Sequence, residues 1–145
     1  MNMFSSFNIN ASGMTAQRKR MDIVSTNIAN VDTTRTEEGG PYRRKMPVFR
    51  ERGGQTFVSI LRGSSQGEEN GAELSAIAED QKPFKLIHNP THPDANEDGY
   101  VEMPNVDITT EMVDMIDASR AYEANVTAMN TLKNMATKAL EIGRG

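Results

Sequence analysis

The 145-residue sequence contains no cysteine and no tryptophan, and only 6% of its residues are aromatic. Without cysteine the chain forms no disulfide and offers no thiolate ligand to zinc, so its stability depends on packing alone. No apolar run approaches the roughly 18 residues that a membrane-spanning helix needs. Residues 1–13 lack the basic start and the apolar core of a secretory signal, so we expect no cleaved signal of that kind. The protein therefore either stays in the cytosol or leaves it by a route that reads something else.

Charge and hydropathy exclude further classes of protein. The formal net charge is −4, which argues against nucleic acid or an anionic membrane surface as the partner. A hydrophobic fraction of 37% and a mean hydropathy of −0.58 leave little apolar material for a deep core, so partners should supply part of the burial. No nucleophile, base and acid fall at a catalytic spacing, and no glycine-rich phosphate loop is present. We therefore expect no enzymatic activity and no cofactor.

What the sequence does contain is a helical apolar pattern at each end. We expect a first helix from about residues 5–10 to about Asn30, in which Gly13 would let another backbone approach closely. A final helix should begin at Asp107 as its N-cap and stop at Ile142, with Gly143 as the C′ residue. The N-terminal stripe contains Met14, Gln17, Met21, Val24, Ile28 and Val31. The C-terminal stripe contains Met112, Met115, Ser119, Tyr122, Val126, Met129, Lys133, Ala136 and Leu140. We expect the two stripes to pair with each other or with neighbouring molecules.

The middle of the chain has the β-branched and aromatic composition of short strands. The predicted strands are 42–49, 56–61, 72–78, 84–88 and 100–103. Residues 62–71 offer almost nothing to bury and predict a mobile loop. The sequence thus predicts an α+β fold in which long N- and C-terminal helices pair as a coiled-coil-like bundle around a small irregular β region. The corresponding domain organisation is 1–34, 35–106 and 107–145.

Two spacings resemble metal sites and are better explained as turns. His88 and His92 stand four apart, but Pro90 makes a helix there very unfavourable, and no third zinc ligand is evident. Residues 94–99 match the first half of a calcium-binding loop, yet the twelfth position is Asn105 instead of a bidentate glutamate. We therefore expect a polar turn and no metal.

An RNA-binding surface would place exposed aromatic residues beside the two short basic runs, 18–20 and 43–45, and only Tyr42 and Phe49 meet this condition. The two runs predict a solvated helix face and a strand edge protected by charge.

Several segments, in this order, resemble the flagellar rod, hook and hook-associated axial proteins. The segment 25–34 (STNIANVDTT), at the end of the first helix, resembles the N-terminal signature of that family. The segments that narrow the resemblance to the proximal rod members are 40–45 (GPYRRK), 92–95 (HPDA), 98–101 (DGYV), 103–107 (MPNVD), 120–126 (RAYEANV) and 139–144 (ALEIGR). Residues 50–71 carry little of the resemblance.

The resemblance implies a structural subunit of the basal-body rod. It implies self-assembly and assembly with other rod proteins into a helical tube that crosses the periplasm and transmits motor torque. Membrane-ring and rod-junction proteins would be partners, and the flagellar type III export apparatus would export the chain without a cleaved signal. A different axial component of the rod or hook is the alternative within this class, and a calcium-binding interaction module is the alternative outside it.

The candidate site residues follow from the two helices. The N-terminal assembly residues are Met14, Met21, Val24, Asn27, Ile28, Asn30 and Val31. The C-terminal assembly residues are Met112, Met115, Tyr122, Val126, Met129, Ala136 and Leu140. Arg43, Arg44 and Lys45 are candidates for contacts with acidic faces of adjacent subunits, which would add specificity more than affinity.

Overall fold

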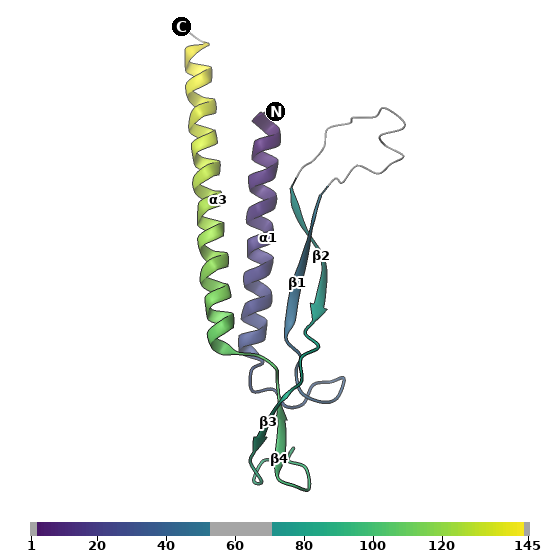
Figure 1. Ribbon diagram of the computed structural model, residues 1–145. Coiled ribbons are helices and arrows are strands. Elements are labelled where there is room, and N and C mark those ends of the chain that lie inside the picture. The colour runs from purple at the N-terminus through teal and green to yellow at the C-terminus, as the bar shows by residue number, and fades with distance from the viewer. Residues whose placement is uncertain (1–2, 53–70, 144–145) are drawn as a thin grey trace, which may run out of the picture. The chain divides into compact units, whose positions relative to one another are not determined.

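The computed structural model describes residues 3–52 and 71–143. Helix α1 spans Met3–Ala29 and helix α3 spans Ile108–Ile142 (Figure 1). Between them lie the strands β1 (Lys45–Glu51), β2 (Ala72–Glu79), β3 (Lys85–His88) and β4 (Tyr100–Met103). The fold is α+β, as the sequence predicts. Within the described ranges, neither helix combines the length and the hydropathy needed to cross a membrane.

Helix α3 begins and ends where the sequence predicts. The Thr110 backbone N–H donates to the Asp107 carboxylate at 3.0 Å, so Asp107 is the predicted N-cap. This hydrogen bond is the main cause that lowers the pKa of Asp107, with the neighbouring Lys85 ammonium adding to it. At the other end Gly143 directly follows the helix and donates to the Ala139 carbonyl at 3.2 Å. Its φ is not in the left-handed region, so the glycine terminates α3 without the left-handed turn that many C′ glycines adopt.

The strands form two separate two-stranded sheets. Strands β1 and β2 form one sheet, closed at its two ends by backbone hydrogen bonds from Arg52 to Gly71 and from Asp80 to Arg44. Strands β3 and β4 pair antiparallel, with Lys85 opposite Met103 and His88 opposite Tyr100. The predicted strand 56–61 and all but the last residue of the predicted loop 62–71 lie outside the described residues.

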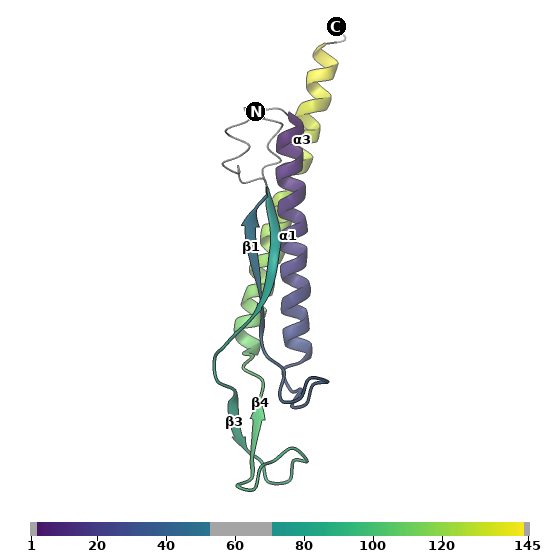
Figure 2. The same cartoon turned by 90° about the vertical axis from the view of Figure 1, so that its right-hand side faces the viewer.

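The chain divides into two compact units. The first consists of Met1–Lys19, Phe49–Ser75 and Ala118–Gly145. Within it, the start of α1 runs beside the later part of α3 (Figures 1 and 2). A Cβ added at Gly13 would lie 3.1 Å from the Asn125 side chain. Gly13 therefore allows the close approach of a side chain, whereas the sequence predicts the close approach of another backbone. The nearby Ser12 hydroxyl accepts a hydrogen bond from the Ala72 N–H at 3.1 Å, which attaches β2 to α1.

The second unit consists of Arg20–Val48 and Ala76–Asp117. Its buried apolar side chains are few: Ile23, Val24, Tyr42, Val101, Pro104 and Val106. Two of its most deeply buried side chains are polar, namely Asn27 at 1% exposure and Glu111 at 0%. Because buried polar groups are costly unless they are hydrogen-bonded, the partners of these two residues decide how the unit is held together.

Candidate assembly site

Asn27 is the centre of a buried polar cluster that joins three segments of the second unit. Its amide nitrogen donates to the Lys45 carbonyl and to the Glu111 carboxylate, both at 2.9 Å. Its amide oxygen accepts from the Lys45 N–H and from the Tyr42 hydroxyl, also at 2.9 Å. All the hydrogen-bonding capacity of one side-chain amide is therefore used, and α1 is fixed to the start of β1 and to α3. We call Asn27, Tyr42, Arg44, Glu111 and Asp114 the polar junction.

The charged half of the polar junction is an arginine among carboxylates. The Arg44 Nε donates to Glu111 at 2.5 Å, and another guanidinium nitrogen donates to Asp114 at 3.2 Å. Asp80 lies 4.0 Å from the same guanidinium. Arg20 of α1, in the same unit, donates to Asp114 at 2.9 Å. The Glu111 carboxylate thus has a charge partner and an amide partner, which is the condition for a carboxylate to stay buried.

A second amide side chain, that of Asn105, forms hydrogen bonds with the Arg44 backbone and with the segment after β2. The Arg44 backbone N–H donates to the Asn105 Oδ1 at 2.8 Å, and the Asn105 Nδ2 donates to the Asp80 carbonyl at 3.0 Å. Asp80 is itself buried, and its carboxylate accepts from the Lys82 N–H at 3.0 Å. The segment after β2 and the segment before α3 are therefore both attached to Arg44.

Burial raises the pKa of the Tyr42 phenol, and the nearby Glu111 and Glu79 carboxylates add to this shift. Both effects disfavour a phenolate beside existing negative charge. Tyr42 therefore remains a neutral donor to Asn27 well into the alkaline range.

The structure changes the interpretation of the basic run 43–45. Arg44 is predicted as a contact to an adjacent subunit, but its side chain is only 19% exposed and faces three carboxylates of its own chain. It lies inside the chain because Glu111, buried on α3, needs a cation. Arg43 instead lies with its guanidinium 4.4 Å from the centre of the Phe84 ring, and Lys45 lies 5.7 Å from that of Tyr42. Contacts of Arg43, Arg44 and Lys45 to a neighbouring subunit stay predictions.

The N-terminal candidate residues fall on the less exposed side of α1 and just beyond its end. Val24 and Asn27 are buried, whereas Met14, Met21, Ile28, Asn30 and Val31 are half-buried. The Asn30 amide donates to the Thr26 carbonyl of its own helix at 2.8 Å, so it caps locally, while Asn27 bridges between segments. A role of these residues in assembly stays a prediction.

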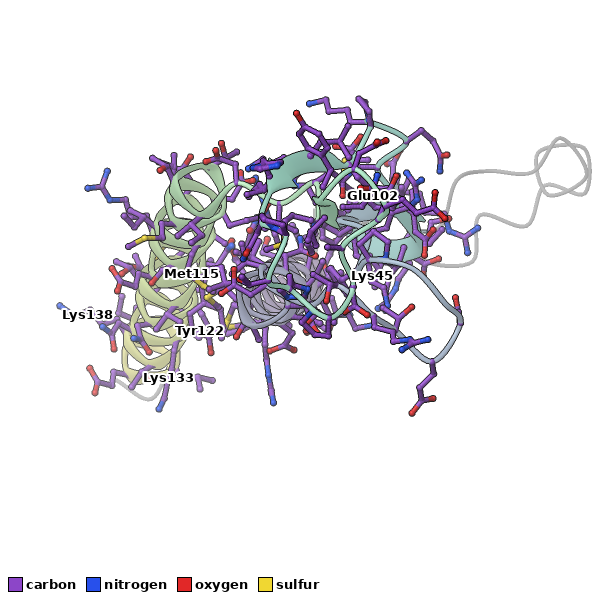
Figure 3. The ribbon with its side chains drawn as sticks, turned by 90° about the horizontal axis from the view of Figure 1, so that it is seen from below. Lys45, Glu102, Met115, Tyr122, Lys133 and Lys138 are labelled. Atoms are coloured by element: carbon purple, nitrogen blue, oxygen red, sulfur yellow. The ribbon has the colours of Figure 1, made fainter. Side chains whose placement is uncertain are left out.

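The C-terminal candidate residues divide between two faces of α3. Met115, Tyr122, Val126, Met129 and Ala136 are half-buried, and Figure 3 shows Met115 and Tyr122 on the side toward α1, with Lys138 on the outer side. Met112 and Leu140 are 55% and 71% exposed and do not belong to the packed face.

The packed face of α3 follows a seven-residue repeat that differs from the predicted stripe at every second position. Its least exposed residues are Glu111, Met115, Ala118, Tyr122, Asn125, Met129, Leu132 and Ala136, together with flanking positions such as Val126. The predicted stripe and the packed face share Met115, Tyr122, Met129 and Ala136. At the positions between these, the predicted stripe contains the next residue along the chain, for example Met112 where the packed face has Glu111. Both registers satisfy a seven-residue repeat, and apolarity alone favours Met112 and Leu140. Glu111 occupies the packed face because Asn27 and Arg44 provide its partners, and no sequence spacing indicates such long-range pairs.

The outer face of α3 is apolar over its first turns. Ile108, Met112, Val113 and Ile116 are 47–55% exposed. Large apolar side chains that remain exposed together on one helix are typical of an interaction surface.

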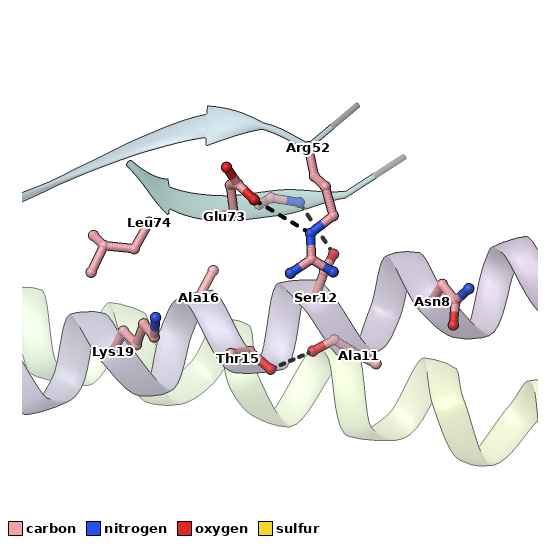
Figure 4. A pocket seen from close by; sticks show the side chains of 10 residues that line it. Asn8, Ala11, Ser12, Thr15, Ala16, Lys19, Arg52, Glu73 and Leu74 are labelled. Carbon is pink, nitrogen blue, oxygen red and sulfur yellow. Dashed lines mark hydrogen bonds and ion pairs between the residues drawn. The ribbon is translucent and has the colours of Figure 1, made fainter. Parts of the chain in front are cut away.

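A polar pocket of about 360 Å³ lies in the first unit between α1 and the ends of β1 and β2 (Figure 4). Its carboxylate, Glu73, pairs with Arg50 and Arg52, and the hydrogen bond from Arg50 is the largest cause that lowers the Glu73 pKa, with Arg52 adding to it. Ser12 donates to the Ile9 carbonyl at 2.7 Å and accepts from Ala72. Glu73 and Ser12 therefore have partners within the chain, and the Ser12–Ala72 hydrogen bond attaches β2 to α1 beside the pocket.

The turn between β3 and β4 uses its polar groups to fold itself. The Asn96 side-chain oxygen accepts from the N–H groups of Asp98 and Tyr100, and Gly99 has a φ of 78°. His92 accepts from the Asp94 N–H at 3.1 Å through Nδ1. In the described part of the chain, no group of three or more His, Asp and Glu side chains is placed to hold a metal ion.

Comparison with known proteins gives two family matches and a set of similar chains. Residues 7–35 match the family described as "Flagella basal body rod protein", and residues 97–142 match "Flagellar basal body rod FlgEFG protein C-terminal". The flagellar basal-body rod protein FlgC of Bacillus subtilis (strain 168) is 52% identical, and the alignment covers 99% of this chain and 100% of that protein. The protein of the same name from Borreliella burgdorferi is 46% identical over the whole of both chains. That of Salmonella typhimurium is 39% identical over 95% of this chain and 96% of its own length.

Proposed function

Because the chain belongs to the FlgC family of flagellar basal-body rod proteins, we propose that it is a structural subunit that assembles with further copies and with other rod proteins into a helical tube. In this role the tube is the proximal rod, and it transmits motor torque across the periplasm. The membrane-ring and rod-junction proteins are further partners. The chain reaches its site through the flagellar type III export apparatus without cleavage of a signal.

The exposed apolar face of α3 is the observation that carries this proposal. Ile108, Met112, Val113 and Ile116 are about half exposed in the isolated chain. Burying such side chains is favourable by about 1.5–3 kcal/mol each when burial is complete. If this face of one subunit contacts a different patch on the next subunit, each end of the assembly still presents one free face or patch. Such an assembly can grow without closing.

Mass spectrometry of purified hook–basal bodies tests the proposal directly. We expect peptides of this chain in intact particles and their depletion from preparations stripped to the membrane ring. The N-terminal peptide should begin without loss of a signal segment. Absence of the chain from intact particles would refute the structural role.

A substitution on the packed face separates assembly from export. Met129→Asp places a carboxylate on the half-buried side of α3, where an unpaired charge is costly. We expect this variant to be secreted but to be absent from rods, with loss of motility. Asn130→Asp is the matched control, because Asn130 is exposed on the same turn. Normal motility with Met129→Asp would contradict the requirement for this face.

A further inference from the structure

The first unit contains a shallow groove of about 700 Å³ between α1 and α3. On α3 it is lined by Ala124, Thr127, Ala128, Thr131 and Leu132, and on α1 by Ser6 and Asn10. Rows of residues four apart form the walls of such grooves, and small side chains in these rows let another helix approach closely. A groove lined by alanine and threonine is therefore shaped for a helix.

Three of the polar side chains of the groove donate hydrogen bonds within their own helices. The hydroxyl of Thr127 donates to the Glu123 carbonyl at 2.9 Å, and that of Thr131 donates to the Thr127 carbonyl at 3.0 Å. The Asn10 amide donates to the Ser6 carbonyl at 3.0 Å. The threonine donors thus have partners within α3, and the threonine methyl groups lie with Ala124, Ala128 and Leu132 in a mostly apolar groove.

The complementary shape is present on the same chain. Ile108, Met112 and Ile116 are four residues apart and are 47%, 55% and 50% exposed. Residues spaced by four form one ridge on a helix, and a ridge of this kind packs into the groove between two such rows on another helix. The second unit therefore carries the ridge, and the first unit carries a groove of matching periodicity.

We propose that the ridge Ile108–Met112–Ile116 of one copy docks into the Ala124–Ala128 groove of a second copy. This inference rests on the proposed rod function and specifies its subunit contact. Met112 and Ala128 are sixteen positions apart on one continuous helix, or about 24 Å at 1.5 Å per residue. The contact point on one copy therefore lies about 24 Å further along α3 than the contact point on the other copy.

Symmetry and charge favour a parallel arrangement of the two α3 helices. A head-to-tail contact that repeats along an axis keeps all subunits in the same polarity, whereas an antiparallel contact closes into a two-fold dimer. At an offset of sixteen, the exposed Asp117 lies level with the exposed Lys133 of the neighbour. The like-charged pair at this offset is Asp107 with Glu123, and Asp107 already lies 3.9 Å from Lys85 of its own chain.

Engineered cysteines test the contact in assembled flagella, because the natural chain has none. Oxidation forms a disulfide only where two Cα atoms come within about 7 Å. We expect the double variant Met112→Cys/Ala128→Cys to give dimers and higher multiples, and each single variant to give none. Coexpression of the two single variants should give dimers alone, because each copy then carries one cysteine, either on the ridge or in the groove, and can form only one disulfide.

The matched control is Met112→Cys/Asn130→Cys. Asn130 is exposed and lies two residues from Ala128, which places it about 160° around the helix. We expect no disulfide from this pair. A disulfide from the control but not from the first pair would overturn the docking, as would a disulfide from Met112→Cys to a different protein. In either case the chain is still found in the basal bodies, whereas its absence from them would refute the rod function itself.

Discussion

Replacing Arg44 with methionine removes the cation of the polar junction while keeping much of its apolar volume. The Glu111 side chain is 0% exposed and accepts from Arg44 and Asn27. Loss of Arg44 leaves this carboxylate buried without a cation, and Asp80 and Asp114 lose a neighbouring positive charge as well. Breaking one partner of a buried ion pair costs about 3–5 kcal/mol. Because the whole free energy of unfolding is about 5–15 kcal/mol, we expect a large loss of stability.

Urea unfolding of the purified chain measures this loss. With a slope of about 2 kcal/mol per M, a cost of about 4 kcal/mol lowers the midpoint by about 2 M. The matched control is Arg35→Met, whose side chain is 82% exposed and lies 3.9 Å from Asp94. We expect that control to change stability by less than about 1 kcal/mol.

The double variant Arg44→Met/Glu111→Met makes the physical reasoning refutable. Once both charges are absent, no uncompensated carboxylate remains, so the double variant should be more stable than Arg44→Met alone. The amide of Asn27 then lacks one acceptor, which limits the recovery by about 1–3 kcal/mol. Additive losses in the double variant, or a loss below about 1 kcal/mol in Arg44→Met, would show that the buried pair does not govern stability.

Three further predictions concern the junction and the contact between α1 and β2. Asn27→Leu leaves several buried groups without partners and should lower the free energy of unfolding by at least about 2 kcal/mol in urea, whereas an unchanged midpoint would mean that water replaces the amide. Because the pKa of Tyr42 is raised in the folded chain, the unfolded state releases the phenol proton first as the pH rises. The contribution of Tyr42 to stability is therefore complete below about pH 10 and is lost above it. A urea midpoint measured from about pH 9 to 11.5 should fall more steeply in the natural chain than in Tyr42→Phe. Gly71→Ala would place a Cβ in overlap with the Ser12 hydroxyl and should destabilise by about 1–3 kcal/mol, and a variant with natural stability would refute that close approach.

The sequence correctly located most of the described elements because their signals are local. The cap at Asp107, the stop after Ile142 and the strand 100–103 are set by residues adjacent in the chain. The family also follows from contiguous segments such as 25–34. Spacing could not decide between the two heptad registers of α3, because each one keeps Met115 and Tyr122 on the packed face.

The amino-acid sequence by itself determined the α+β class, the two terminal helices and the family of rod proteins. Only the tertiary structure decided that Arg44 pairs with Glu111 of its own chain, that Glu111 replaces Met112 on the packed face, and that Asn27 joins α1 to β1 and α3. The physical reason is that helix and strand formation depends on neighbours a few residues apart. A buried polar junction instead depends on groups 15 to 84 positions apart, whose hydrogen bonds exist only once the segments meet.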